Sequence, residues 1–154
     1  MIINMLLNTV LMKDLFLELI VGYNYLIKIG SPAVEIPLSY ISLDSFSVTR
    51  ATQDLDSYRD ATGVLHRNVL GHKVGKVEFT TPIITQKNLT ALLSLISSNY
   101  SDATAKTLAV EAWCIEIGDY LQMTCYVPDI TPKIMQNSPL GLIYEPVRIA
   151  FIEY

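Results

Sequence analysis

The sequence predicts a mainly β protein, a β-sandwich or flattened barrel with one packed α-helix. Three observations favour this fold class. From residue 25 onward, apolar and polar residues alternate with a period of two in several short stretches, as in half-buried strands. Glycine and proline separate these stretches. A helical spacing of apolar residues occurs in one stretch of the domain, between residues 85 and 98.

The composition favours a single domain that is partly covered by a partner. The chain has 154 residues, enough to bury a core, and we assign residues 25–154 to one β-sandwich domain. Only 17% of the residues are charged and 51% are hydrophobic, with a mean hydropathy of +0.35. This is apolar for a soluble monomer and indicates self-association. The net charge of −4, with scattered Lys and Arg, argues against nucleic-acid binding.

Residues 1–24 are an apolar N-terminal extension for which we expect a helix. Asn4, Asn8, Asp14 and Glu18 fall on one narrow stripe of a helical wheel, which leaves a broad apolar surface. The uninterrupted apolar run is shorter than the roughly 20 residues that a membrane-spanning helix needs, and no signal-peptide pattern is present. We therefore expect no membrane span and a helix that packs on protein. The alternative is an over-extended reading-frame start that adds nothing to the fold.

Three strands are predicted before residue 51. Residues 25–29 form the first, closed by Gly30-Ser31-Pro32, and residues 33–36 return as a short edge strand. The third runs from Tyr40 to Arg50. Its apolar alternation changes phase at Ser45, which is the pattern of a β-bulge.

One helix is predicted within the domain. Thr85 is a suitable N-cap, and apolar residues follow at helical spacing as far as Ser98. Its apolar stripe, which we expect to cover the sheet, consists of Leu89, Leu92, Leu93 and Ile96.

A hairpin is predicted from residues 108–117 and 120–127, joined by the two-residue loop Gly118-Asp119. In this register Trp113 lies opposite Thr124. The face that we expect in the core carries Ala112, Cys114, Met123 and Cys125. The two cysteines are diagonal to each other in this arrangement, so we expect free thiols rather than a disulfide. Residues 128–139 are predicted to be irregular, followed by a last strand over 142–144 and 147–152.

The stretch between the third strand and the strand around Val77 and Phe79 is the most unusual part of the chain. We interpret residues 52–73 as a long loop, because the segment is polar, mixed in charge and interrupted by glycine. Its charged residues surround the apolar pair Val64-Leu65. This composition is suited to a protein interface with a small buried centre. The candidate subunit-contact residues are Asp56, Arg59, Asp60, Val64, Leu65, His66 and Arg67.

No catalytic, cofactor or metal site is predicted. His66 and His72, with Asp60 and Glu78 nearby in the sequence, match no dedicated metal-ligand spacing. Asp54, Asp56 and Asp60 resemble the start of a calcium loop, but Leu65 occupies the position that requires a bidentate Glu. There is no nucleophile elbow and no phosphate-binding glycine pattern.

The alternative function is a ligand-binding β-module, with surface carbohydrate as a candidate ligand. Tyr23, Tyr25, Tyr40 and Tyr58 would form its binding face together with the loop. Tyrosines are also ordinary in half-buried strands.

Four segments carry a resemblance to a known family: Leu26-Ile27-Lys28-Ile29-Gly30, the run from Arg59 to Asn68, Lys76-Val77-Glu78-Phe79 and the closing Phe151-Ile152-Glu153-Tyr154. With them, residues 25–154 resemble an uncharacterised family of short proteins encoded among the tail genes of long-tailed bacteriophages and prophages. Residues 1–24 depart from that family, whose members usually start near the first strand.

The resemblance implies a tail-tube-like fold and a virion structural role, and it names no catalytic residue. We expect a non-enzymatic tail protein that forms a homo-oligomeric ring or tube through its long loop and its sheet edges, with other phage tail proteins as partners. Its location would be the virion tail, assembled in the bacterial host cytoplasm. Ring closure would also hide sheet edges and account for an apolar composition without a membrane.

Overall fold

The computed structural model describes residues 25–139 and 141–154, so the expected N-terminal helix lies outside the described residues. In chain order the elements are β1 (Ile27–Ile29), β2 (Val34–Glu35), the 3-10 helices η1 (Leu38–Tyr40) and η2 (Leu43–Ser45), β3 (Ser47–Arg59), β4 (Leu65–Thr80), β5 (Ile84–Thr85), α2 (Gln86–Ser98), β6 (Thr107–Cys114), β7 (Asp119–Tyr126), β8 (Ile134–Ser138), β9 (Gly141–Tyr144) and β10 (Arg148–Glu153).

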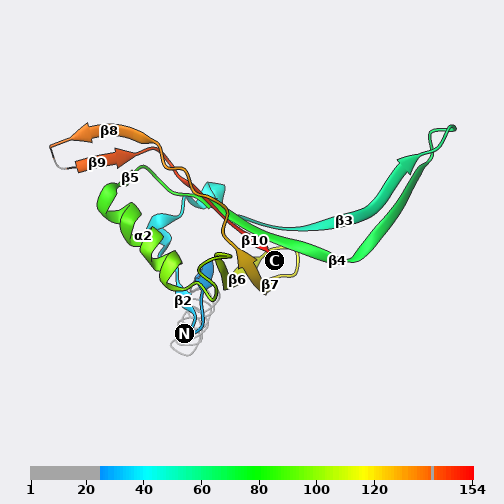
Figure 1. Cartoon of the computed structure of the whole chain (residues 1–154), viewed down its shortest axis with the longest axis horizontal. Helices are drawn as coiled ribbons and strands as arrows, with labels where there is room; N and C mark the ends of the chain where they lie inside the picture. Colours follow the sequence, from blue (N-terminus) through cyan, green and yellow to red (C-terminus); the bar gives the residue numbers. More distant parts are fainter. Residues whose placement is uncertain (1–24, 140) are drawn as a thin grey trace, which may run out of the picture.

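Within these residues the strands form two antiparallel sheets. The larger has seven strands in the order β2-β1-β6-β7-β10-β4-β3, and the smaller has three in the order β5-β9-β8. Helix α2 lies at the end of the molecule that carries the smaller sheet, and the far ends of β3 and β4 project from the opposite end (Figure 1). The predicted mainly β fold with one packed helix is confirmed.

Helix α2 begins where the sequence predicts. The Thr85 hydroxyl accepts a hydrogen bond from the Asn88 N–H at 3.4 Å and caps the first turn. Leu89, Leu92 and Ile96 are buried, and the predicted stripe member Leu93 is partly buried. These side chains belong to one apolar core that includes β4 and β10, whose largest fully buried residues are Phe79 and Phe151.

The prediction of a strand from Tyr40 to Arg50 is wrong for the first half of that segment. That half contains η1 and η2, and β3 begins only at Ser47. The phase change at Ser45 marks a capped turn and not a bulge, because its hydroxyl donates to the Ser42 carbonyl at 2.6 Å and accepts from the Thr80 N–H at 2.8 Å. A local side-chain hydrogen bond of this kind competes with strand formation.

The β6–β7 hairpin is present, but its predicted register is wrong. Trp113 pairs with Tyr120, and Cys114 pairs with Asp119, which leaves residues 115–118 as the turn. The N–H groups of Ile117 and Gly118 both donate to the Cys114 carbonyl. Relative to the prediction, the partner of Trp113 moves by four residues, an even number that keeps each side chain on its face. The predicted core face, Ala112, Cys114, Met123 and Cys125, is therefore buried as expected.

Two stretches expected to lack regular structure contain strands. Residues 134–138 form β8, inside the segment predicted to be irregular, and most of its side chains are exposed. Residues 52–73 are not a loop: most of them belong to β3 and β4, which pair along most of their length and turn over residues 60–64. Exposure on both faces explains the second error, because neither strand shows apolar alternation there.

Candidate subunit-contact site on the arm

The outer parts of β3 and β4 form a two-stranded arm, which we define as residues 50–75. Strand β10 pairs with β4 only from Thr80 to Lys76, so beyond Lys76 the only described neighbour of β4 is β3. The ten residues from Arg50 to Arg59 extend about 30 Å at about 3.3 Å per residue. The arm therefore reaches well beyond the core, as Figure 1 shows.

The arm is bent at two irregularities in its pairing. The register shifts between Thr52 and Asp54 and again between Asp54 and Asp56. Extra residues on one strand bend the ribbon and increase its twist, in agreement with the curvature in Figure 1.

Asp60 organises the turn at the tip. One carboxylate oxygen accepts hydrogen bonds from the N–H and hydroxyl of Thr62, at 2.9 and 2.6 Å, and from the Val64 N–H at 3.0 Å. The other lies 2.8 Å from Nε2 of His66. The hydrogen bond from the Thr62 hydroxyl, followed by that from His66, lowers the pKa of Asp60 to about 2. Gly63 supplies the positive φ of +85° that the turn requires.

Side chains on both faces of the ribbon form contacts between the two strands near the tip. On one face the rings of Tyr58 and His66, which are direct cross-strand partners, stack with centroids 4.9 Å apart. On the other, Arg67 makes two hydrogen bonds to the Asp54 carboxylate, at 2.8 and 2.9 Å. Arg59 donates to the Gly63 carbonyl at 2.9 Å and lies directly across from Leu65. The arm is thus an ordered ribbon with defined faces.

Large apolar side chains in the arm are exposed to solvent. Val64 and Leu65 are 55% and 47% exposed, so they are no part of the domain's own core. Four more exposed apolar residues of the arm were not among the predicted contact residues: Leu55, Tyr58, Val69 and Leu70. Sequence reasoning missed them because the irregular pairing hides their strand periodicity.

The base of the arm is tied to the body by charged groups. Lys73 forms an ion pair with Glu116 in the β6–β7 turn, and Arg50 lies 3.8 Å from the same carboxylate. Glu153 at the end of β10 lies 3.3 Å from His72 and accepts a hydrogen bond from the Gly75 N–H. These contacts hold the arm in one direction relative to the sheet.

The structure brings all seven predicted contact residues to the outer part of the arm, but it does not assemble a metal site. His66 and His72 are six residues apart on one strand, a separation on the order of 20 Å, and each faces a different carboxylate. Over residues 25–139 and 141–154, no three His, Cys, Asp or Glu side chains are grouped so as to hold a metal ion. Asp54 and Asp60 are engaged with Arg67 and the turn.

Three tyrosines of the alternative ligand-binding hypothesis lie in the described structure and do not share a face there, and Tyr23 lies outside the described residues. Tyr40 lies in η1 against the core, and Tyr58 lies on the arm. Tyr25 stacks on Tyr120 with ring centroids 4.4 Å apart, and its hydroxyl donates to Glu111. That hydrogen bond, together with burial, raises the pKa of Tyr25 to about 12.

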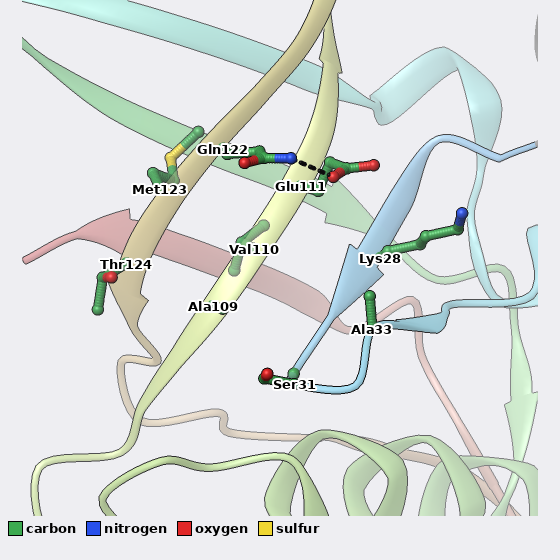
Figure 2. Close-up of a pocket in the computed structure, with 10 residues that line it drawn as sticks. Lys28, Ser31, Ala33, Ala109, Val110, Glu111, Gln122, Met123 and Thr124 are labelled. Atoms are coloured by element: carbon green, nitrogen blue, oxygen red, sulfur yellow. Dashed lines mark hydrogen bonds between the residues drawn. The ribbon is translucent and has the colours of Figure 1, made fainter.

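A groove of about 550 Å³ lies beside this tyrosine pair, over β1, β6 and β7. Its carboxylate, Glu111, already accepts hydrogen bonds from Tyr25 and from Gln122, the latter at 2.7 Å (Figure 2). Lys28 lies 3.6 Å from the centre of the Tyr25 ring. The charged groups of this groove are therefore engaged within the protein itself.

Both cysteines are free and buried. Burial raises the pKa of the Cys125 thiol to about 12, with a smaller contribution from Glu153. Because the thiolate is the reactive form, Cys125 is unsuited to nucleophilic chemistry at neutral pH.

The fold and the arm define a mainly β protein with a projecting hairpin. The chain belongs to a family of unknown function, DUF6711, whose sequence profile matches residues 21–154. Searches of curated proteins and of solved structures gave no significant match. No helix in the described part of the chain is long and apolar enough to span a membrane.

Proposed function

We propose that this chain is a non-enzymatic structural protein of a phage or prophage tail, whose copies assemble into a ring or tube through the arm and the sheet edges. The observation that carries the assembly role is the arm. A two-stranded ribbon alone is at best marginally stable in water, and this one exposes Val64 at 55% and Leu55 at 69%. Contact with another subunit would cover these side chains.

The sheet edges support the same proposal. Strand β3 is the edge of the larger sheet over 13 residues, and β8 is an edge of the smaller sheet with Ile134 and Met135 more than half exposed. Long exposed edges favour pairing with other chains, and closed rings remove them. The assignment to a phage or prophage tail is supported by the sequence resemblance of residues 25–154. Other tail proteins would be further partners, in virions assembled in the host cytoplasm.

Truncation of the arm tests the assembly role. Asp56 and Asn68 are direct cross-strand partners, so residues 57–67 between them can be replaced by the two-residue turn Asn-Gly without leaving one strand longer than the other. We expect a folded monomer by circular dichroism and analytical ultracentrifugation, while the full-length chain forms a defined oligomer. A truncated chain that assembles to the same size would refute the role of the arm.

A matched variant keeps the arm and removes its apolar tip. Val64→Ser together with Leu65→Ser should weaken assembly, whereas Leu43→Ser, at a 66% exposed position in η2, should leave it unchanged. The tail assignment needs a separate measurement. Mass spectrometry of particles induced from a host that carries the gene should find this chain in many copies per particle, and its absence from purified particles would contradict that assignment.

A further inference from the structure

The body of the molecule carries a groove that no segment of residues 25–139 or 141–154 fills. It lies between residues 128–133 and 145–152, encloses about 320 Å³, and has Ile130, Ala150 and Ile152 among its lining residues. Its lining thus offers aliphatic surface to side chains from another chain.

Two charges beside this groove have no ion-pair partner in the described part of the chain. Lys133 and Glu145 are joined by a backbone hydrogen bond of 3.0 Å from the Glu145 N–H to the Lys133 carbonyl, but neither side chain forms an ion pair. The other two charges of the groove are satisfied, because Asp129 pairs with Lys106 and Arg148 with Glu78.

One face of the arm tip combines an exposed apolar side chain with charges of both signs, which are the features that this groove also has. Leu65 is 47% exposed and lies directly opposite Arg59 across the ribbon, so the two side chains point to the same side. Arg59 bonds only to a backbone carbonyl in the described structure. The same face carries the Asp54–Arg67 ion pair, so it presents charges of both signs, as the groove does.

We infer that the arm tip of one copy binds this groove in the next copy, with Leu65 on the aliphatic lining and Arg59 paired to Glu145. The inference rests on the proposed assembly function and names its acceptor surface. Arm and groove are different surfaces, so the contact is head to tail and generates a ring or an open filament. The arm points away from the body of its own chain (Figure 1), so its tip would reach this groove in a second copy and not in its own.

The groove over β1, β6 and β7 is a poorer acceptor for Arg59. Its carboxylate, Glu111, accepts hydrogen bonds from Tyr25 and from Gln122, the second of which Figure 2 shows. A new ion pair would have to displace those bonds. Glu145 is exposed and its side chain forms no ion pair in the described part of the chain, so it can pair with an incoming guanidinium without that loss.

A charge-swap experiment tests the pairing. We expect Arg59→Glu and Glu145→Arg, each alone, to weaken assembly at least about tenfold in dissociation constant, because each places like charges together. The double variant restores opposite charges at every contact and should assemble within about threefold of the unmodified chain. Sedimentation equilibrium over a range of concentrations measures all three. Lys87→Glu and Asp44→Arg are controls with the same charge changes at other exposed positions and should assemble normally.

The outcomes separate the inference from the proposed function. Single reversals without effect, or a double variant as weak as the singles, would overturn the assignment of the groove, even if truncation of the arm abolishes assembly. A full-length chain that remains monomeric at all concentrations would overturn both. Because a folding defect from Arg59→Glu cannot be repaired by Glu145→Arg, recovery in the double variant supports the contact itself.

Discussion

Replacement of Leu92 by alanine tests whether α2 is held by packing against the sheets. Leu92 is 0% exposed and belongs to the main apolar core. Leucine and alanine are both good helix formers, so the substitution measures loss of packing rather than loss of helix propensity. Truncation of a fully buried leucine costs about 2 to 5 kcal/mol, a large share of the roughly 5 to 15 kcal/mol that stabilises a typical domain.

Leu93 provides the matched control one residue along the same helix. Its side chain is only partly buried at the margin of the core, so Leu93→Ala should cost roughly half as much. Urea denaturation followed by circular dichroism, at one fixed protein concentration, gives both values as shifts in midpoint at unchanged slope. A loss below about 0.5 kcal/mol for Leu92→Ala, or a larger loss for Leu93→Ala, would refute the packing described for α2.

Three further predictions concern a turn, the absence of a metal and the arm tip. Gly30 has a φ of +83°, and a Cβ added there would lie 2.1 Å from Oδ1 of Asn99. Gly118 also has a positive φ, of +65°, but a Cβ added there would meet no other atom within 4 Å. Gly30→Ala should therefore lower the unfolding midpoint more than Gly118→Ala. EDTA should leave the melting temperature unchanged, and a large drop would instead indicate a metal site that uses His66 or His72. Because the pKa of Asp60 is lowered to about 2 from an ordinary 3.8, its stabilisation of the tip is complete above about pH 4 and is lost as the pH falls through 2. Amide hydrogen exchange at Thr62 and Val64 should follow that loss, whereas Asp60→Asn should show no such pH dependence.

Local features of the fold could be predicted from the sequence because the interactions behind them are local. Thr85 caps a helix whose apolar spacing is visible over a few turns. The core face of the β6–β7 hairpin was predicted correctly despite a wrong register, because an even shift leaves every side chain on its original face. The candidate contact residues were also found in the right region, since mixed charge around an apolar pair is a property of composition.

The arm itself could not be predicted in this way. A ribbon exposed on both faces shows no apolar alternation, and the shifts near Asp54 interrupt what periodicity remains. The turn at Ser45 could not be predicted either. Its hydroxyl is held by the N–H of Thr80, a residue far away in the sequence that no local pattern around Ser45 indicates.

The sequence by itself therefore determined the fold class, the helix, the buried face of the hairpin and the segment that carries the candidate contacts. Only the tertiary structure decided that this segment is a paired ribbon, that Val64 and Leu65 stay outside the core, and that Glu145 lies beside a groove with no ion-pair partner among the described residues. The physical reason is the range of the interactions. Helix caps and strand alternation depend on residues that are close together in the sequence. Strand register and groove shape depend on backbone hydrogen bonds and packing between residues far apart in the chain.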